Sequence, residues 1–562
     1  MRNHSFLWLC LAILFFGSCK KQEVNAQQNT GTGADLVFIN GNIYTHSTAE
    51  AVVVRNGKIE FIGTNADAQK YIGSNTQTID LQGRSLLPGF IDNHVHAGEG
   101  GEVSCLPSDA LNIEQQKSTL KKCAEGVAEG QWVIGYGMFL DQVLGTGTTL
   151  NKPIKSLDEI FPKHPVIIME QTSHSMFVNT LALNKAGIDK NTPDPQGGKL
   201  MKDENGELNG VLIDNAGDLV MEIAVNSLTN KASIFVEGVK FGLQELKKNG
   251  ITTIGDGRTY WRRGMLDAWK TVANDGLLTA RVSIRPWIYP TVDKTQQLTF
   301  LKGAFQNDIN QLLIVNQVKM YIDGVPENGT ARLIQPYAQT YFQDSPYGIN
   351  YISQTNMASW LSDLYNIGYG AHVHALGDKG IREVLDAVQV VRNQGSQLKY
   401  HITHVAMLDK VDLPRFAQLS VDADIQVGNT PLTQQERAND FVPFIGATRA
   451  SELLYSPVKA LKASGANVTL SSDWTVYPLS PLNGISVSVQ EGSLTIQEAI
   501  DAYTINPAKA LGLDSITGSI TVGKSADFVV LEKDLTKISA SEIKTTRVMM
   551  TMLQGKIVYE VQ

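Results

Sequence analysis

Cysteine is scarce in this sequence, whose 562 residues include four. Cys10 and Cys19 lie in an N-terminal leader, so Cys105 and Cys123 are the two that remain in the body of the chain. Their spacing suits no metal site. In an oxidising compartment they could form a disulfide, and two free buried thiols are the alternative.

Long apolar runs, repeats and an excess of positive charge are also missing. The apolar run from Phe6 to Phe16 is too short to span a membrane as a mature helix. A net charge of −8 argues against nucleic acid as a partner, because phosphate binding needs a basic surface. With 43% hydrophobic and 19% charged residues, the chain has the composition of an ordinary folded protein, long enough for one α/β barrel with an appended domain.

The leader predicts export and attachment to a membrane. Arg2 and His4 precede the apolar run, as in a secretory signal peptide. The run ends at Gly17-Ser18-Cys19, which resembles the lipobox of bacterial lipoproteins, where the cysteine carries the lipid. We therefore expect a signal peptide over residues 1–19, a flexible tether over 20–34 and a lipid on Cys19. The protein would then be anchored in the bacterial cell envelope, exposed to the periplasm or the cell surface. A plain signal peptide cut elsewhere is the alternative.

Both ends of the body have the pattern of short strands and turns. Residues 35–84 contain hairpin signals such as Asn56-Gly57, and residues 513–562 contain a similar turn at Gln554-Gly555. Neither segment can form a core alone, so we expect the two to pair into one small β-sandwich domain.

Between these segments, strands alternate with amphipathic helices. We count eight apolar runs with flanking turns: Leu86–His96, Ile251–Asp256, Arg281–Trp287, Val318–Asp323, Tyr369–His374, Tyr400–Val405, Leu419–Val427 and Val468–Asp473. This predicts an α/β fold, a (β/α)8 TIM barrel over residues 85–512. The first crossover is too long for one helix, so residues from about 105 to 230 should form an insertion.

Polar residues capable of metal chemistry recur in these strands. His94 and His96 lie two residues apart, so in a strand they share a face, either as packed polar rings or as ligands of one metal. The others are Lys319 in the fourth strand, His374 in the fifth, His404 in the sixth and Asp473 in the eighth. In a barrel the C-terminal strand ends converge on one mouth, which favours the metal-site hypothesis.

Ordered motifs run along nearly the whole body of the chain. They are Leu87-Pro88-Gly89-Phe90-Ile91-Asp92 before His94, Ser173-His174-Ser175, Thr192-Pro193-Asp194, Val318-Lys319, His374-Ala375-Leu376-Gly377-Asp378, Ser472-Asp473-Trp474, Thr504-Ile505-Asn506-Pro507-Ala508 and Gly523-Lys524-Ser525-Ala526-Asp527. In this order they resemble the amidohydrolase superfamily, and within it the branch of N-substituted formamide deformylases and related metal-dependent hydrolases.

The resemblance implies a site with two divalent metal ions, zinc being expected. His94 and His96 would bind one ion, and His374 and His404 the other. Lys319 would be carboxylated and bridge them, while Asp473 would bind metal and shuttle protons. Two cations would lower the pKa of a shared water toward neutrality and make hydroxide available. An unmodified, buried Lys319 paired with a carboxylate such as Asp323 is the alternative.

Two further residues are candidates for substrate contact. His174 lies in a motif that in this branch resembles a substrate-contacting loop, with a satisfied surface histidine as the alternative. Arg332 could hold a substrate oxyanion or carboxylate, or form a salt bridge at the rim. The branch usually carries Gln-Pro and a nearby histidine after the seventh strand, where this chain reads Gln426 to Pro431. This departure concerns the substrate pocket more than the metal ligands.

These patterns predict a metal-dependent hydrolase of non-peptide C–N bonds, acting on an amide, formamide or cyclic amide. A mononuclear deaminase of the same superfamily is the second hypothesis, although a bridging Lys319 would have no use there. A third is an envelope lipoprotein that binds a small molecule without turning it over. A small-molecule substrate and the membrane are the expected partners, a homodimer is possible, and nucleic acid is not expected.

Overall fold

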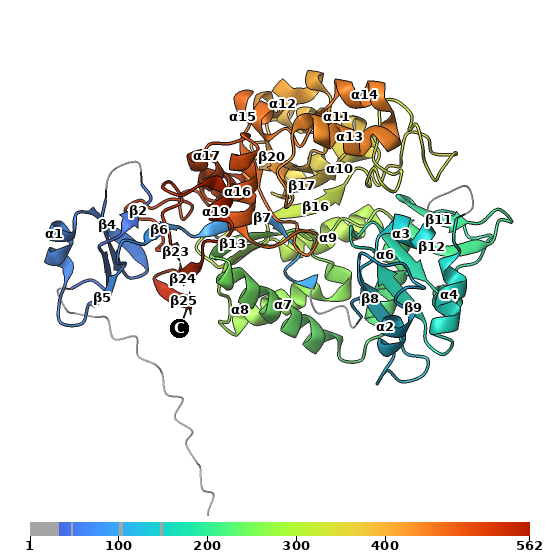
Figure 1. Cartoon of the computed structure of the whole chain (residues 1–562), viewed down its shortest axis with the longest axis horizontal. Coiled ribbons are helices and arrows are strands. Elements are labelled where there is room, and N and C mark those ends of the chain that lie inside the picture. The colour runs from blue at the N-terminus through green and yellow to red at the C-terminus, as the bar shows by residue number, and fades with distance from the viewer. Residues whose placement is uncertain (1–32, 46–48, 100–104, 146–149, 562) are drawn as a thin grey trace, which may run out of the picture.

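The computed structural model describes residues 33–45, 49–99, 105–145 and 150–561. Figure 1 shows three parts side by side: sheets built from both chain ends, a central α/β body, and a separate sheet with helices at the opposite side. The central body carries the candidate site.

Eight parallel strands of the central body correspond to the eight predicted runs. They are β7 (Phe90–Val95), β13 (Ile251–Asp256), β14 (Arg281–Ser283), β16 (Gln317–Tyr321), β17 (Gly370–Ala375), β18 (Tyr400–His404), β20 (Val421–Ile425) and β22 (Val468–Leu470). Each lies within or next to one of the eight predicted runs. The parallel α/β fold class is therefore confirmed.

These strands belong to two parallel sheets that meet at both edges. One sheet has the order β15-β14-β13-β7, with β15 spanning Leu313–Ile314, and the other has the order β16-β17-β18-β20-β22. Parallel bridges connect Trp287 with Lys319 at one junction and Val95 with Trp474 at the other. The strands thus follow one another in a cyclic order, which is the arrangement a (β/α)8 barrel requires.

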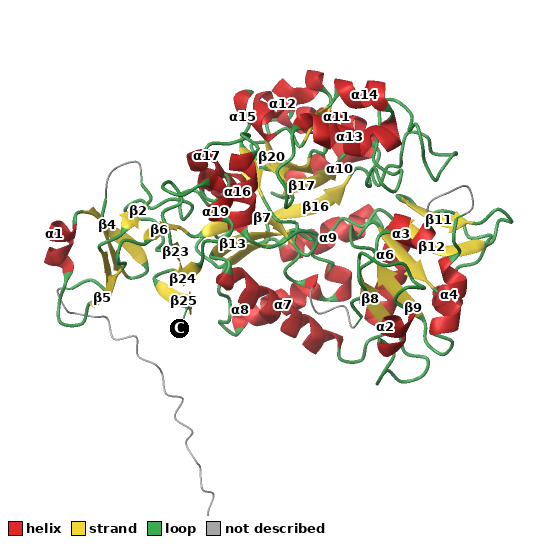
Figure 2. Cartoon of the chain, viewed as in Figure 1, coloured by secondary structure: helices red, strands yellow, loops and turns green. Residues whose placement is uncertain are grey.

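The strands are buried on both faces because helices cover the outer one. Every residue of β7, β13 and β17 is buried, as expected for parallel strands between a core and a helical layer. On the sheet that contains β17, β18 and β20, the outer layer includes helices α10 (Gln354–Asn366), α11 (Asp378–Asn393) and α12 (Leu413–Gln418) (Figure 2). In α11 the buried residues Ile381, Val384, Leu385 and Val388 recur at helical spacing and form the packed face.

Both chain ends contribute to two small sheets beside the central body. The first contains β1 (Leu36–Ile39), β3 (Ala51–Arg55), β4 (Lys58–Gly63) and β5 (Gln77–Asp80). The second contains β2 (Asn42–Ile43), β6 (Ser85–Pro88), β23 (Phe528–Leu531), β24 (Val548–Leu553) and β25 (Lys556–Glu560). Strands β6 and β23 pair antiparallel, and Phe38 meets Phe528 edge to face at 5.9 Å in the shared core.

The predicted first strand, Leu86–His96, is two strands that serve different parts. Strand β6 ends at Pro88 in the outer sheet, and β7 begins at Phe90 in the central body. Gly89 connects them, and a Cβ there would lie 2.2 Å from the Oγ1 of Thr252. The chain can turn between the two sheets because glycine allows this close approach.

An insertion follows β7 and forms its own sheet and core. Its strands have the order β11-β12-β10-β9-β8. They span Gly198–Lys202, Leu208–Asp214, Ser175–Val178, Val166–Met169 and Val133–Tyr136 in that order, with helices α2 (Lys117–Lys122), α3 (Leu140–Leu144), α4 (Pro153–Ile160), α5 (Thr180–Ala186) and α6 (Asn215–Asn226). Cys105 and Cys123 form a disulfide in this insertion, which decides between the two alternatives left open above.

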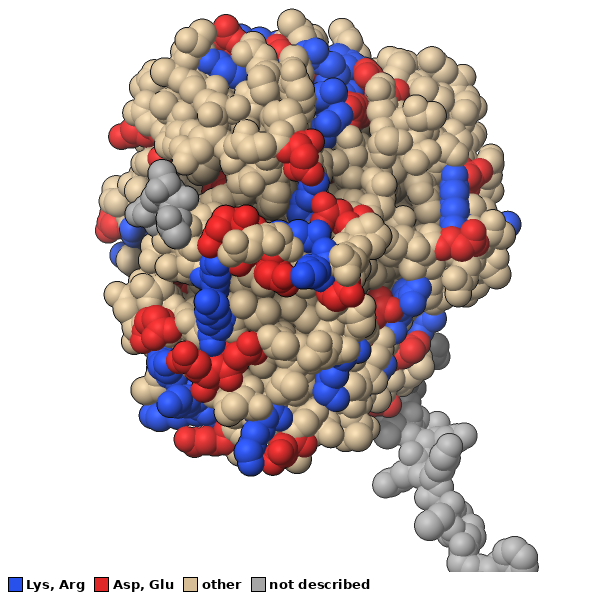
Figure 3. All heavy atoms as spheres, turned by 90° about the vertical axis from the view of Figure 1, so that its right-hand side faces the viewer, with Lys and Arg blue, Asp and Glu red and all other residues tan. Residues whose placement is uncertain are grey.

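The predicted signal peptide and Cys19 lie outside the described residues. Among the helices that the structure describes, none is long and apolar enough to cross a membrane. The face that includes the insertion carries Lys and Arg side chains interspersed with Asp and Glu (Figure 3).

Candidate metal centre and active site

The predicted metal-binding side chains converge at the C-terminal ends of the central strands. His94 lies near the end of β7 and His96 just after it, while His374 and His404 lie at the ends of β17 and β18. Asp473 follows β22, and Lys319 lies within β16. His94, His96, Lys319, His374 and Asp473 are each less than 9% exposed, and His404 is half-buried.

Asp473 brings the first part of this group together. Its Oδ1 lies 2.9 Å from the Nε2 of His96 and 3.3 Å from the Nε2 of His94. The Nζ of Lys319 lies 3.0 Å from the same His94 nitrogen. Ligand atoms of His94, His404 and Asp473 all lie within 4.8 Å of one another. Nitrogen and carboxylate oxygen atoms at such separations match the donors that a transition metal such as zinc prefers.

His374 and His404 extend the group on its other side. Their ring centres lie 4.6 Å apart, and the rings of His94 and His404 lie 5.2 Å apart. The Nδ1 of His374 is buried and has no hydrogen-bond partner among the described residues, which is costly unless a ligand satisfies it. Two further imidazoles therefore lie beside the group formed by His94, His96 and Asp473.

The charge states of these histidines suit metal binding. Burial lowers the pKa of His94, His374 and His404, and neighbouring cationic groups reinforce the shift for His94 and His374; for His404 the pKa falls to about 3. Neutral imidazole is the form that binds metal. Burial also lowers the pKa of His96, but Glu99 and Asp473 raise it more strongly, to about 9. A cation at this position must therefore displace a proton from His96.

Supporting residues determine which ring nitrogen faces the centre. The Thr403 hydroxyl donates to Asp424 (2.9 Å) and therefore accepts from the Nδ1 of His94 (2.8 Å). The other two supports are Glu99, whose Oε1 lies 3.0 Å from the Nδ1 of His96, and Gln426, whose Oε1 lies 2.8 Å from the Nδ1 of His404. A proton on each Nδ1 leaves Nε2 of the neutral ring free as a ligand atom.

Sequence reasoning missed Glu99, Thr403 and Asp424. Gln426 was singled out only as part of a departure from the family pattern. Glu99 lies three residues after His96, and Thr403 directly precedes His404, so proximity in sequence was the available signal. Nothing local pointed to Asp424.

Lys319 is completely buried among these groups. Burial and the guanidinium groups of Arg285 and Arg258 hold its pKa well below the usual value, although Asp473 opposes them. Asp323, the partner considered in the alternative hypothesis, instead accepts hydrogen bonds from the backbone N–H groups of Arg332, Leu376 and Gly377. The Lys319–Asp323 pair of the alternative hypothesis is therefore not formed.

Of the two candidates for substrate contact, His174 lies beside the candidate centre and Arg332 does not line its cavity. His174 lies 4.8 Å from His374 between ring centres, and its Nδ1 is 2.7 Å from the Oδ1 of Asp214. The Arg332 guanidinium instead pairs with Glu383 at 3.1 Å, which is the salt-bridge arrangement considered above. Of the two, His174 alone lines the cavity over the centre.

A cavity of about 420 Å³ lies over the candidate centre. His174, His374, His404 and Asp473 lie in its wall. The loop from Gln426 to Thr430, the segment that departs from the family pattern, lines it as well. The remaining lining includes Glu327, Arg437, Asp440, Phe441 and Tyr477. Substrate selection therefore depends on segments outside the metal-binding set.

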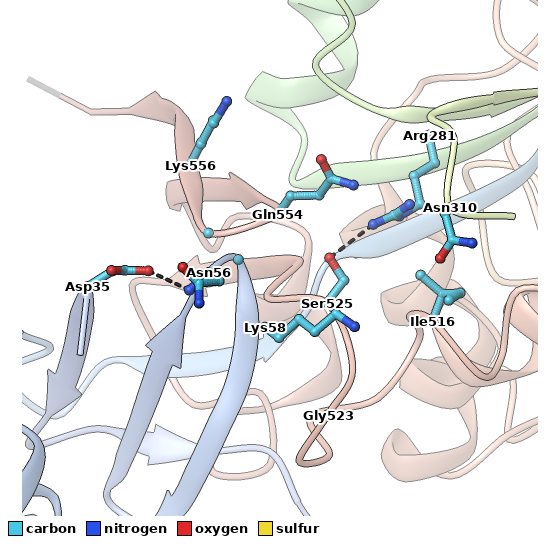
Figure 4. A pocket seen from close by; sticks show the side chains of 12 residues that line it. Asp35, Asn56, Lys58, Arg281, Asn310, Ile516, Gly523, Ser525, Gln554 and Lys556 are labelled. Atoms are coloured by element: carbon cyan, nitrogen blue, oxygen red, sulfur yellow. Dashed lines mark hydrogen bonds between the residues drawn. The ribbon is translucent and has the colours of Figure 1, made fainter. Parts of the chain in front are cut away.

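A larger groove of about 500 Å³ lies between the chain-end sheets and the central body. Figure 4 shows Arg281 donating to Ser525 there, and Asp35 accepting from the backbone of Asn56. None of the predicted site residues lines this groove. The concentration of metal-binding groups, rather than size, places the active site in the central body.

Comparisons with known proteins show which family the chain belongs to. The model of the amidohydrolase family matches residues 77–559. Protein LONG AFTER FAR-RED 3 of Arabidopsis thaliana is 28% identical over 94% of this chain and 92% of its own. N-substituted formamide deformylase of Arthrobacter pascens is 24% identical over 94% and 98%, and putative amidohydrolase YtcJ of Bacillus subtilis is 28% identical over 93% and 99%.

Solved structures support the same fold. An uncharacterized metal-dependent hydrolase from Pyrococcus horikoshii superposes with a TM-score of 0.69 at 21% identity, covering 90% of this chain and 99% of that one. Its counterpart from Pyrococcus furiosus gives 0.66 at 20% identity, covering 89% and 99%.

Proposed function

This chain belongs to the amidohydrolase family and is a hydrolase of carbon–nitrogen bonds, and we propose that its substrate is an amide, a formamide or a cyclic amide. The observation that carries the proposal is the convergence of His94 and His96 on Asp473, which lines the cavity, with Lys319 beside His94. The named deformylase among the relatives supports the choice of substrate class.

The family supports a divalent metal, and we propose that there are two ions, with zinc the expected metal. His94 and His96 would hold one ion, His374 and His404 the other, with a carboxylated Lys319 shared between them and Asp473 as a further ligand. The neutral histidines and the unpartnered Nδ1 of His374 support this assignment. The depressed pKa of Lys319 supports it too, because carbamate formation needs the neutral amine.

When bound, divalent ions would supply Lewis-acid polarisation of the substrate carbonyl and acidify a water molecule. The side chains do the rest. His96 keeps the pKa of Asp473 below the usual value against the effect of burial, so the carboxylate is ionised at neutral pH. It would accept the proton of the attacking water and return it to the leaving nitrogen.

His174 would orient the substrate. Its Nδ1 donates to Asp214, a buried carboxylate, which leaves Nε2 as the ring nitrogen available to the N–H of an amide or formamide. The same bond holds the ring in place beside His374.

A substrate panel tests the proposal directly. Metal-free protein, reloaded with zinc, would be incubated with formamides, N-acyl amino acids and cyclic amides, and the released amine or acid measured. We expect at least one class to be hydrolysed, with activity lost on chelation and recovered on reloading. Failure of every class with fully metal-loaded protein would contradict the proposal.

We also propose that the protein is anchored in the cell envelope through Cys19. The leader pattern is the first support. The Cys105–Cys123 disulfide is the second, because disulfides persist in oxidising compartments such as the periplasm.

A further inference from the structure

The cavity over the candidate centre contains two acidic side chains that its own residues do not neutralise. Glu327 and Asp440 both line it. Among the described residues, neither carboxylate is paired with a cation or with another side chain. At the floor of the same cavity, the buried Nδ1 of His374 also has no partner in the described part of the chain. The cavity therefore presents unpaired polar groups at both its floor and its wall.

A rigid turn places Glu327 in the cavity. The turn is closed by hydrogen bonds from the Gly329 N–H to the Pro326 carbonyl (2.9 Å) and from the Thr330 N–H to the Val325 carbonyl (3.0 Å). Asn328 and Thr330 are completely buried on either side of Gly329, whereas Glu327 is exposed to the cavity. The backbone of Glu327 is thus held at a defined position beside the cavity.

Asp440 comes from the helix that forms another part of the wall. Helix α13 (Gln434–Ile445) presents Arg437, Asp440 and Phe441 to the cavity, at the spacing of three and four residues that defines one helix face. The guanidinium of Arg437 is already used: it donates to Glu491 and, at 3.3 Å, to the carbonyl of Val427. Its ion pair is with Glu491, and it makes none with Asp440.

Confinement makes this charge distribution unfavourable without a ligand. Enclosure by the cavity walls raises the pKa of Glu327; a backbone hydrogen bond and His174 oppose the shift, and the nearby carboxylates of Glu170 and Asp440 add to it. A cation bound between Glu327 and Asp440 would relieve this repulsion.

Aromatic rings complete the wall. Tyr477 and Phe441 both line the cavity, and Tyr477 is 40% exposed. The surrounding cavity walls raise the pKa of Tyr477 to about 12, and the carboxylates of Asp473 and Glu327 contribute, so the phenol stays neutral near Glu327. Aromatic faces beside carboxylates form a good environment for an organic ammonium or guanidinium group.

We propose that Glu327 and Asp440 select substrates that carry a cationic group, an ammonium or a guanidinium, at a distance from the scissile bond. This inference rests on the proposed function and specifies its substrate class: the amide end occupies the floor near Asp473, and the cationic end lies against Glu327, Asp440 and the aromatic rings.

Matched substrate pairs test the selection. Each pair shares one scissile bond and chain length, for example N-formyl-1,6-diaminohexane and its neutral counterpart N-formylhexylamine, with acetamide versions alongside. We expect the cationic member to have a kcat/KM at least 10-fold higher, mostly through KM, and this ratio to fall with ionic strength. Glu327→Gln and Asp440→Asn should each reduce the ratio by about 10-fold, and Glu327→Asp should retain part of it. Asp267→Asn, an exposed acid on helix α8 (Met265–Asn274), is the matched control and should leave the ratio unchanged.

A binding measurement separates this inference from the proposed function. Hexylammonium and hexanol would be titrated into the metal-loaded wild-type protein and the two variants by calorimetry. Tighter binding of hexylammonium that is lost in Glu327→Gln supports the inference even if no amide is hydrolysed, in which case the proposed function alone fails. Equal binding of the two probes, or a ratio that neither variant changes, would overturn it.

Discussion

The side-chain nitrogen of Lys319 lies 3.0 Å from the Nε2 of His94, and both residues are completely or almost completely buried. An ammonium at this place would repel divalent ions by several kcal/mol per pair, even at an effective dielectric constant of about 20. Either one ion is excluded, or the lysine gives up its charge and becomes an anion. Burial already favours the neutral amine.

Replacement of this lysine should therefore remove a shared ligand. We expect Lys319→Ala to lose most activity and one of two metal ions, and short carboxylic acids to restore part of both by taking the place of the bridge. Metal analysis and turnover with and without the added acid are the measurements. Lys270→Ala, an exposed lysine on α8, is the control. Undiminished metal content and activity in Lys319→Ala would assign the lysine a purely structural role.

His374→Ala should lower metal content and reduce turnover by more than ~100-fold, beyond the 10–100-fold cost of losing a supporting partner. The fold should persist, because the ring gives up one hydrogen bond, from its Nε2 to the carbonyl of Gly324 (3.3 Å), while its Nδ1 makes none with the described residues. Elemental analysis, circular dichroism and activity would be compared with those of His94→Ala, which should behave alike. His164→Ala, in the insertion, should match the wild type. An active His374→Ala protein with its full metal content would rule out the second ligand pair.

Metal uptake should become stronger as pH rises. In the metal-free protein the pKa of His96 is about 9, above its usual 6.5, so bound metal must displace a proton. The apparent affinity should rise about 10-fold per pH unit between 6.5 and 9, as measured by competition with a chelator.

The raised pKa of His96 also predicts how the stability of the metal-free protein depends on pH. Because the folded pKa is raised, protonated His96 stabilises the fold fully below pH 6.5, and this contribution, on the order of 3 kcal/mol, is lost as pH rises to 9. Urea unfolding at several pH values would measure it, with His96→Asn showing a flatter profile. Identical pH dependence in the two proteins would contradict the role given to Glu99 and Asp473.

Reduction of the Cys105–Cys123 disulfide should destabilise the insertion. The bond links residues 18 positions apart, for which loop-closure entropy predicts about 3 kcal/mol. Thermal or urea unfolding with and without dithiothreitol would reveal the change. The Cys105→Ser/Cys123→Ser variant should be as unstable as the reduced wild type and insensitive to reductant. A reductant effect of equal size in that variant would point to another cause.

Cys19→Ala should release the protein from the membrane fraction and abolish incorporation of labelled fatty acid. Cys10→Ala, in the same leader, is the control and should still be lipidated. Membrane association and labelling that persist in Cys19→Ala would exclude this cysteine as the anchor.

The amino-acid sequence by itself determined the strands and the chemistry-bearing residues. All eight central strands lie at the predicted places, because apolar runs bounded by turns are local signals. His94, His96, His374, His404 and Asp473 could be recognised because each lies at or near the end of such a run. Their convergence then follows from parallel strand order, in which all C-terminal ends meet at one face.

Tertiary structure alone decided the pairings within and around that set. The contact between His96 and Asp473 joins residues 377 positions apart, and Thr403 donates a hydrogen bond to Asp424 on the neighbouring strand. Arg332 pairs with Glu383 rather than with a ligand. Arg437 forms an ion pair with Glu491, whereas Asp440 has no charged partner among the described residues. Residue type and the local pattern of apolar residues indicate which side chains are available for the site. Which of two charged groups meets a given partner depends on strand register and on the loops that close the cavity, and both are set by packing across the whole chain.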